Sequence, residues 1–139
     1  MLSRRRFGAC ALCAAVGFAA TAVEAQAQSA PAGAGFKRTI LQKSEFPGDK
    51  YATLLVAVEV EPGAIIARHT HPGIETAVVI EGEFELAVKG QAAQALKAGD
   101  SYQVVAEVPH SARNGDKPTR IAVTYVVEKD KPLASPAPE

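Results

Sequence analysis

The chain has 139 residues, 47% of them hydrophobic, and its 15 Lys and Arg are balanced by 15 Asp and Glu. This length suits one domain with one hydrophobic core. A neutral chain that has no basic stripe interleaved with aromatic residues does not fit a nucleic-acid-binding protein, so we expect no nucleic-acid partner.

Residues 1–27 have the three zones of an export signal peptide. Arg4–Arg6 precede an apolar zone that is too short for a stable membrane span, and small residues that suit cleavage after Ala25 or Ala27 follow it. The order Ser3-Arg4-Arg5-Arg6-Phe7 resembles a twin-arginine signal; the alternative is a general secretory signal with an extra arginine. We expect cleavage after Ala27, a periplasmic or secreted protein, and no membrane contact of the mature form.

Both cysteines and the one methionine of the chain fall within this predicted signal. Cys10 and Cys13 form a C-x-x-C pair, but a redox or zinc role is excluded if the segment is removed. The mature chain then has no disulfide and no thiolate metal ligand. Its stability must come from the packing of its core.

Two terminal segments, residues 28–35 and 129–139, are rich in Pro, Ala and Gly, which predicts a flexible linker and a disordered tail. Residues 36–128 form the predicted domain, in which short alternating runs are separated by turn signals and none has a sustained helical period. Only residues 91–97 look briefly helical, and their length favours a strand or a loop. This pattern predicts an all-β sandwich or small barrel.

Two runs show the alternation of a half-buried strand most clearly, one starting at Tyr51 and one following a predicted turn at Glu81-Gly82-Glu83. Three further strand candidates are AGDSYQVV, PHSARN and TRIAVTYVVE. The apolar faces of the first two runs consist of Leu54, Val56, Val58 and Val60, and of Phe84, Leu86 and Val88.

The three histidines of the chain include two that are separated by one residue, His69 and His71. On a strand, both imidazoles leave the same face about 6.6 Å apart, which allows both to reach one ion. Glu75 follows after a Pro-Gly turn that can bring its carboxylate back over the pair, and His110 lies on a later strand. Three imidazoles and a carboxylate suit one divalent transition metal, Mn, Fe, Co, Ni, Cu or Zn, with positions left open for a substrate. The alternative is a set of polar residues on ordinary strands.

At these residues the chain resembles the cupin superfamily. The first cupin motif runs Gly, five residues, His, one, His, three, Glu, six, Gly, and Gly63, His69, His71, Glu75 and Gly82 match it completely. The resemblance implies a single small cupin jelly-roll β-barrel with the ion inside. It assigns the ligand positions to the two histidines, Glu75 and His110.

The second cupin motif is matched in part, by Gly99, His110 and Asn114. Val105 stands where the family has proline, and Glu107 stands where it often uses glycine. These departures put the conformation of the turn before His110 in doubt, but they remove no ligand.

Other candidates for the pocket are fewer. If Glu75 points inward, alternation also turns Ala77 and Val79 inward. The predicted result is a largely aliphatic wall made of these two residues with Val56, Val58, Phe84 and Leu86. Either Tyr102 or Gln103 is the main polar contact, according to which of them faces in. Asn114 matches a family position near the barrel mouth, but stabilising the Asn-Gly turn is its favoured role.

No further histidine or cysteine accompanies the predicted ligands, so an enzyme built here has to use the ion itself, with Glu75 as the catalytic group that moves a proton. Single-domain cupins of this kind resemble flavonol and cysteine dioxygenases, which implies an oxidoreductase acting on a small, partly apolar organic molecule. The alternative is a periplasmic module that binds or senses a metal or small ligand without turnover. A metal-dependent isomerase or decarboxylase fits less well. We also expect a homodimer, because cupin-like barrels commonly pair.

Overall fold

The computed structural model describes residues 35–46, 48 and 50–138, so the predicted signal peptide lies outside the described residues. The described residues form ten β-strands and no helix. In chain order these are β1 (Phe36–Glu45), β2 (Tyr51–Val60), β3 (Ile65–Thr70), β4 (Gly73–Glu81), β5 (Glu83–Val88), β6 (Gln94–Lys97), β7 (Ser101–Val104), β8 (His110–Asn114), β9 (Thr119–Glu128) and β10 (Ser135–Pro136). None of the described segments is a helix that could cross a membrane.

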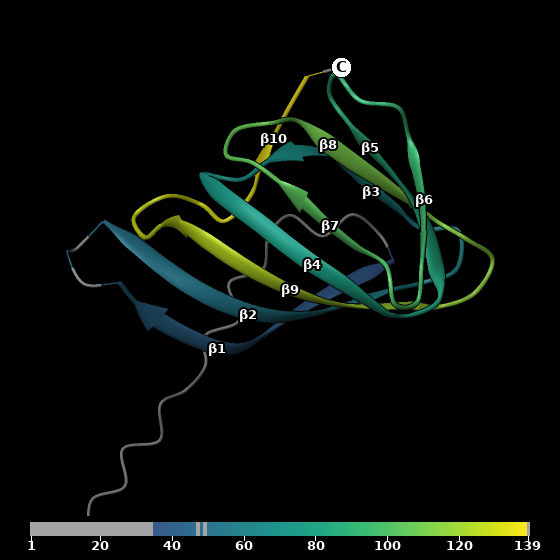
Figure 1. The fold of residues 1–139 in the computed structure, drawn as a ribbon, viewed down its shortest axis with the longest axis horizontal. Helices are drawn as coiled ribbons and strands as arrows, with labels where there is room; N and C mark the ends of the chain where they lie inside the picture. The colour runs from purple at the N-terminus through teal and green to yellow at the C-terminus, as the bar shows by residue number, and fades with distance from the viewer. Residues whose placement is uncertain (1–34, 47, 49, 139) are drawn as a thin grey trace, which may run out of the picture.

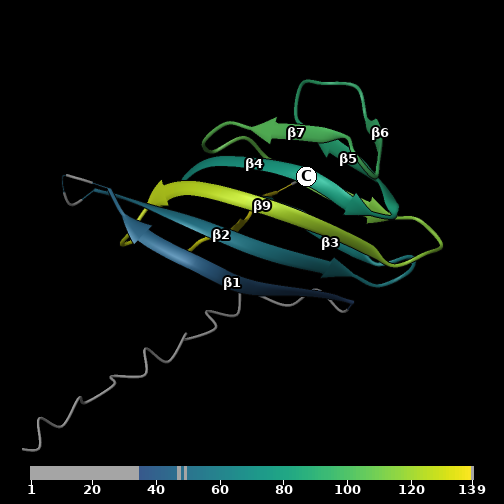
Figure 2. The ribbon, with the colours of Figure 1, turned by 60° about the horizontal axis from the view of Figure 1, so that its bottom comes forward.

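The strands form two five-stranded sheets, one in the order β1-β2-β9-β4-β7 and the other in the order β10-β3-β8-β5-β6. Every pairing within them is antiparallel. The long strands of the first sheet lie side by side, and the second sheet lies behind them (Figures 1 and 2). The prediction of an all-β jelly roll is confirmed. The described strands do not, however, close into one hydrogen-bonded barrel, because no ladder joins the two sheets.

The core between the sheets contains the apolar faces that the sequence predicts. On β2 every second side chain is buried, from Ala52 to Val60, and β5 alternates in the same way. The central strand β9 is buried from Thr119 to Val127 with the same period of two. Residues 91–97 end in β6, so the strand-or-loop interpretation of this segment is correct.

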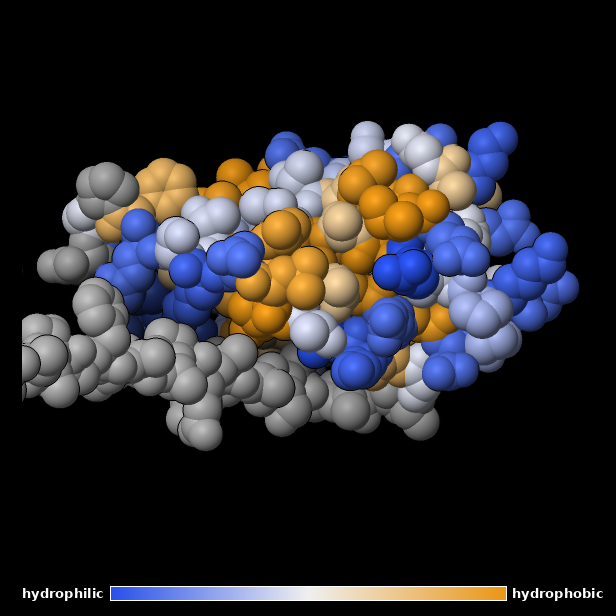
Figure 3. Space-filling view, turned by 90° about the horizontal axis from the view of Figure 1, so that it is seen from below, coloured by the Kyte–Doolittle hydropathy of each residue, from blue (hydrophilic) through white to orange (hydrophobic). Residues whose placement is uncertain are grey.

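The outward side of the first sheet is also apolar near its centre. Cross-strand pairing sets Ala57 beside Ala122 and Ala122 beside Val78, which forms one such row across β2, β9 and β4. Apolar side chains gather across the middle of this face (Figure 3). We call this surface the outer face, and its apolar members are Leu55, Ala57, Ile74, Val78, Ala122 and Val126.

The C-terminal segment is not a free tail. Strand β10 pairs with the edge of the second sheet, where Pro136 lies opposite His69, and Leu133 packs against the core. The Arg68 side chain adds a hydrogen bond of 3.0 Å to the carbonyl oxygen of Pro138. The predicted disorder of residues 129–139 is therefore wrong for residues 129–138. Their composition is typical of disorder, but the unpaired backbone of β3 offers a partner that composition does not reveal.

Candidate metal centre

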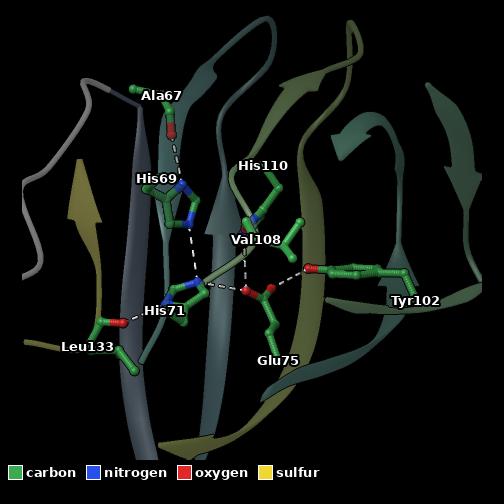
Figure 4. Close-up of polar contacts among 8 residues, drawn as sticks. All are labelled: Ala67, His69, His71, Glu75, Tyr102, Val108, His110 and Leu133. Atoms are coloured by element: carbon green, nitrogen blue, oxygen red, sulfur yellow. Dashed lines mark hydrogen bonds and ion pairs between the residues drawn. The ribbon is translucent and has the colours of Figure 1, made fainter. Parts of the chain in front are cut away.

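Four side chains from separate parts of the fold converge at one end of the space between the sheets (Figure 4). His69 lies near the end of β3 and pairs with His110 at the start of β8. His71 follows β3, and Glu75 lies on β4 after the turn at Pro72. One ligand atom from each of the four lies within 4.8 Å of the others. The structure thus brings together all four residues that the sequence predicts as ligands.

The three imidazoles are oriented alike. Each Nδ1 atom faces a main-chain carbonyl oxygen, which can only accept a hydrogen bond, so Nδ1 carries the proton and the lone pair of Nε2 points to the centre. Histidines that bind metals commonly donate their other ring N–H in this way. The carbonyl partners are those of Ala67 for His69 at 2.8 Å, Leu133 for His71, and Val108 for His110 at 3.0 Å.

The resulting centre brings hydrogen-bond acceptors together. The Nε2 atoms of His69 and His71 are 3.2 Å apart, and Glu75 Oε2 lies 2.7 Å from Nε2 of His71 and 3.3 Å from Nε2 of His110. Glu75 Oε2 and His110 Nε2 are buried without a hydrogen-bond partner among the described residues. Acceptors this close repel one another unless positive charge lies between them, as a second proton on an imidazole or as a cation. One metal ion satisfies all four groups at once, so the donor set fits an ion.

Two pKa shifts favour the protonation states that bind metal. Burial, together with a smaller contribution from the neighbouring His110, lowers the pKa of His69 to about 4, so its imidazole is neutral at pH 7. Burial alone would raise the pKa of Glu75, but the nearby imidazoles of His110 and His71 outweigh burial and hold this pKa below its ordinary value. A neutral imidazole and an ionised carboxylate are the forms that ligate a divalent cation.

The second oxygen of Glu75 is held by a tyrosine. Tyr102 Oη donates a hydrogen bond of 2.7 Å to Glu75 Oε1. Burial and the Glu75 charge raise the pKa of Tyr102 well above its ordinary value, so it remains a protonated donor. Tyr102 is thus the inward member of the Tyr102–Gln103 pair, while exposed Gln103 donates to the Thr76 hydroxyl at 2.9 Å.

A narrow cavity adjoins the predicted ligands, with a volume of about 20 Å³, which is room for a water-sized molecule. Six of its thirteen lining residues are aliphatic and come from both sheets, including Val58 and Leu86 from the predicted aliphatic wall. Arg38 of β1 also lines it, and sequence reasoning missed this residue. The signal was present, since Arg38 stands between Phe36 and Ile40 in an alternating run, but its meaning depends on the pairing of β1 with β2.

Asn114 has a structural role away from the ligands. Its side-chain amide is buried and donates to three carbonyl oxygens, which joins the end of β2 to the turn after β8. This agrees with the favoured interpretation of Asn114 as a residue that stabilises a turn. The acceptors are those of Val60 at 3.1 Å, Glu61 at 2.8 Å and Lys117 at 2.9 Å.

The turn before His110 contains a left-handed residue. Glu107 has φ of 62° and is the one non-glycine residue with positive φ in the described part of the chain. Its amide donates to the carbonyl oxygen of His71 at 3.0 Å. The turn therefore takes the conformation that favours glycine, although the sequence supplies glutamate there.

Comparison with protein families gives a match over residues 56–127 to the family model described as Cupin domain. This segment contains all four predicted ligands. No curated protein matches the chain.

Solved structures give similar folds. An uncharacterized conserved protein with a double-stranded β-helix domain from Klebsiella pneumoniae is 28% identical with a TM-score of 0.60, over 79% of this chain and 90% of that one. An RmlC-like cupin from Shewanella frigidimarina is 28% identical with a TM-score of 0.56, over 73% of this chain and 83% of that one. The DMSP lyase DddQ from Ruegeria pomeroyi is 23% identical with a TM-score of 0.63, and the match covers 74% of this chain but only 52% of the lyase.

Proposed function

The chain belongs to the cupin domain family, and from this premise we propose that it binds one divalent transition metal through His69, His71, Glu75 and His110. The convergence of three Nε2 lone pairs, each fixed by a carbonyl contact at Nδ1, is the observation that carries the proposal. Three nitrogens and one oxygen suit Mn, Fe, Co, Ni, Cu or Zn and leave coordination positions open.

We propose further that the site is a dioxygenase-like centre for a small, partly apolar organic molecule. When bound, the metal would supply a Lewis acid and a site for O₂. The aliphatic side chains among the residues that line the cavity support a partly apolar substrate. Glu75 is the carboxylate among the predicted ligands, so it is the group placed to accept a proton, and Tyr102 holds its Oε1 atom while Oε2 faces the imidazoles.

A second candidate function is a module that binds a metal or small ligand without turnover. The cavity volume of about 20 Å³ favours it, because a substrate of any size requires side chains to move aside before it can reach the ligands.

Oxygen consumption separates the two functions. Protein loaded with Fe²⁺ should consume O₂ when phenolic or thiol substrates are added if it is a dioxygenase, and should consume none if it only binds. Glu75→Gln should still melt at a higher temperature with metal than without it, since three imidazoles remain. Its turnover should nevertheless fall by at least about 10²-fold, the lower size of a general-base contribution.

We propose that residues 1–27 direct export through the twin-arginine route to the periplasm or the exterior. The support is the order Ser3-Arg4-Arg5-Arg6-Phe7 together with an interior metal site, which is loaded most simply before a folded protein crosses the membrane. Replacing Arg4 and Arg5 with lysine should leave folded protein in the cytoplasm. Unchanged export of this variant would contradict the twin-arginine assignment.

We propose that the protein is a homodimer that pairs through the outer face. Its exposed apolar side chains include Ile74 and Val78, which are 39% and 38% exposed. A contiguous apolar patch of this kind marks a protein contact. Two copies of the outer face would form a self-complementary interface about a two-fold axis.

A further inference from the structure

The inward side of β1 carries one charged residue in an apolar row. Arg38 pairs with Val58 of β2, and Val58 pairs with Ile121 of β9. The side chains of all three line the cavity beside the predicted metal ligands. Phe36 and Ile40, which share the inward face of β1 with Arg38, pack against the core. A guanidinium at this position is therefore directed into the cavity.

The surroundings hold this guanidinium without neutralising it. Its carbon Cζ lies 5.0 Å from the centre of the Phe36 ring, which positions the cation by a contact with the aromatic face. Arg38 Nε is buried and has no hydrogen-bond partner among the described residues, and Arg38 forms none of the ion pairs found there. A buried donor that carries positive charge costs stability unless an acceptor meets it.

Charge in the cavity points to an anion as that acceptor. Arg38 is the one Lys or Arg that lines the cavity. Burial lowers the pKa of His69, and the charge of Arg38 lowers it as well. Burial raises the pKa of Tyr102 and of Tyr125; the charge of Arg38 opposes this rise at both phenols, and at Tyr125 a side-chain hydrogen bond with Arg38 opposes it too. The field of Arg38 therefore reaches the predicted ligands and both phenols. A divalent ion beside one carboxylate adds further net positive charge.

We propose that Arg38 binds the carboxylate of a small organic acid that enters the cavity beside the predicted metal ligands. This inference deepens the proposed function and rests on metal binding at that site. The planar fork of a guanidinium matches the two oxygens of a carboxylate, and a cavity of about 20 Å³ admits only a compact group. Phosphate fits less well, because no second cationic side chain lines the cavity. Aliphatic side chains of the lining would face the short aliphatic part of such an acid once side chains move aside to admit it.

The test uses propionate and propionamide, which differ only in the charged group, as probes of protein loaded with Co²⁺. Calorimetry and the visible spectrum of Co²⁺ both report binding. Propionate should bind to the unmutated protein, and Arg38→Gln should weaken it by at least about tenfold, the loss of one charge-assisted hydrogen bond. The Co²⁺ affinity should change less than about threefold. Arg38→Lys keeps the charge but not the planar fork, so its propionate affinity should lie between those of the unmutated protein and of Arg38→Gln.

The matched control is Arg120→Gln. Arg120 is exposed on β9, so this substitution should leave the affinities for propionate and for Co²⁺ unchanged. Thermal melting of each variant shows whether it folds.

Equal propionate affinity in Arg38→Gln and in the unmutated protein would overturn the inference while leaving metal binding intact. Equal affinity for propionamide and propionate, or tight binding of inorganic phosphate with no binding of propionate, would overturn the carboxylate assignment. If Co²⁺ does not bind, the proposed function fails. Titration of the metal-free protein with propionate then tests the inference about Arg38 by itself. Propionate binding that depends on Arg38 in that titration supports it, and no binding rejects it.

Discussion

The Nδ1 atom of His71 lies against the main-chain carbonyl oxygen of Leu133, 62 residues further along the chain. His71 is 2% exposed, and the segment that contains Leu133 runs back along β3 to form β10. This contact fixes the tautomer in which Nε2 of His71 faces the other ligands. The C-terminal segment is thus part of the support of the predicted metal centre (Figure 4).

Ending the chain after Lys131 should weaken metal binding by roughly 10–100-fold, the usual effect of losing a group that orients a ligand. The deletion removes the Leu133 carbonyl and leaves Nδ1 of His71 to water. Calorimetric titration with Zn²⁺ measures the effect. The control ends after Pro136, which keeps Leu133 and both residues of β10. Equal Zn²⁺ affinity in the two truncations would show that the contact does not support the site.

Tyr102→Phe should weaken metal binding by about tenfold while leaving the fold intact. It removes the hydrogen bond to Glu75 Oε1 and frees that carboxylate to turn away from the imidazoles. Zn²⁺ titration is again the measurement. Tyr51→Phe is the matched control, since Tyr51 is exposed on β2. A loss of affinity no larger than the control's would mean that Tyr102 only fills space.

Glu107→Gly should stabilise the protein by up to about 1 kcal/mol. The left-handed conformation at this position costs a non-glycine residue about 1–2 kcal/mol, and the greater freedom of glycine in the unfolded chain offsets part of the gain. Glu107→Val, which is β-branched, should destabilise it. Urea unfolding gives both free energies of unfolding. If glycine is the less stable of the two variants, φ at this turn is not what limits stability.

Val78→Glu should convert the dimer to a monomer, because it sets a charge at the centre of the outer face opposite its own copy. Light scattering at micromolar concentration gives the mass. Ile65→Glu is the control, since Ile65 is 50% exposed on the other sheet and should leave the dimer intact. A monomeric mass for the unmutated protein would refute the homodimer at once.

Local patterns predict much of the fold and of the site. The alternation of β2 and β5 identifies the buried face because side chains on a strand change sides at every residue. The same alternation turns His69 and His71 to one face of a strand. The Pro-Gly turn after them brings Glu75 back over the pair. The unusual turn at Glu107 is visible as a departure from a glycine position.

Features set by strand pairing are not visible in local patterns. Arg38 becomes a cavity residue only because β1 pairs with β2 in a register that sets Arg38 beside Val58. The tail becomes ordered only because β3 is an edge that accepts Ser135 and Pro136. Both depend on contacts between segments far apart in the sequence, about which composition and periodicity carry no information.

Metal titration of the metal-free protein, followed by thermal melting, tests the central claim most directly. One ion per chain should bind, and metal at about one hundred times its dissociation constant should add roughly 2.7 kcal/mol to the free energy of unfolding. The melting temperature should then rise by on the order of 10 °C. His71→Ala should lose most of this rise, whereas Gln103→Ala, at an exposed neighbour of Tyr102, should keep it. If none of Mn, Fe, Co, Ni, Cu and Zn changes the melting temperature of the unmutated protein, that result would contradict metal binding by His69, His71, Glu75 and His110.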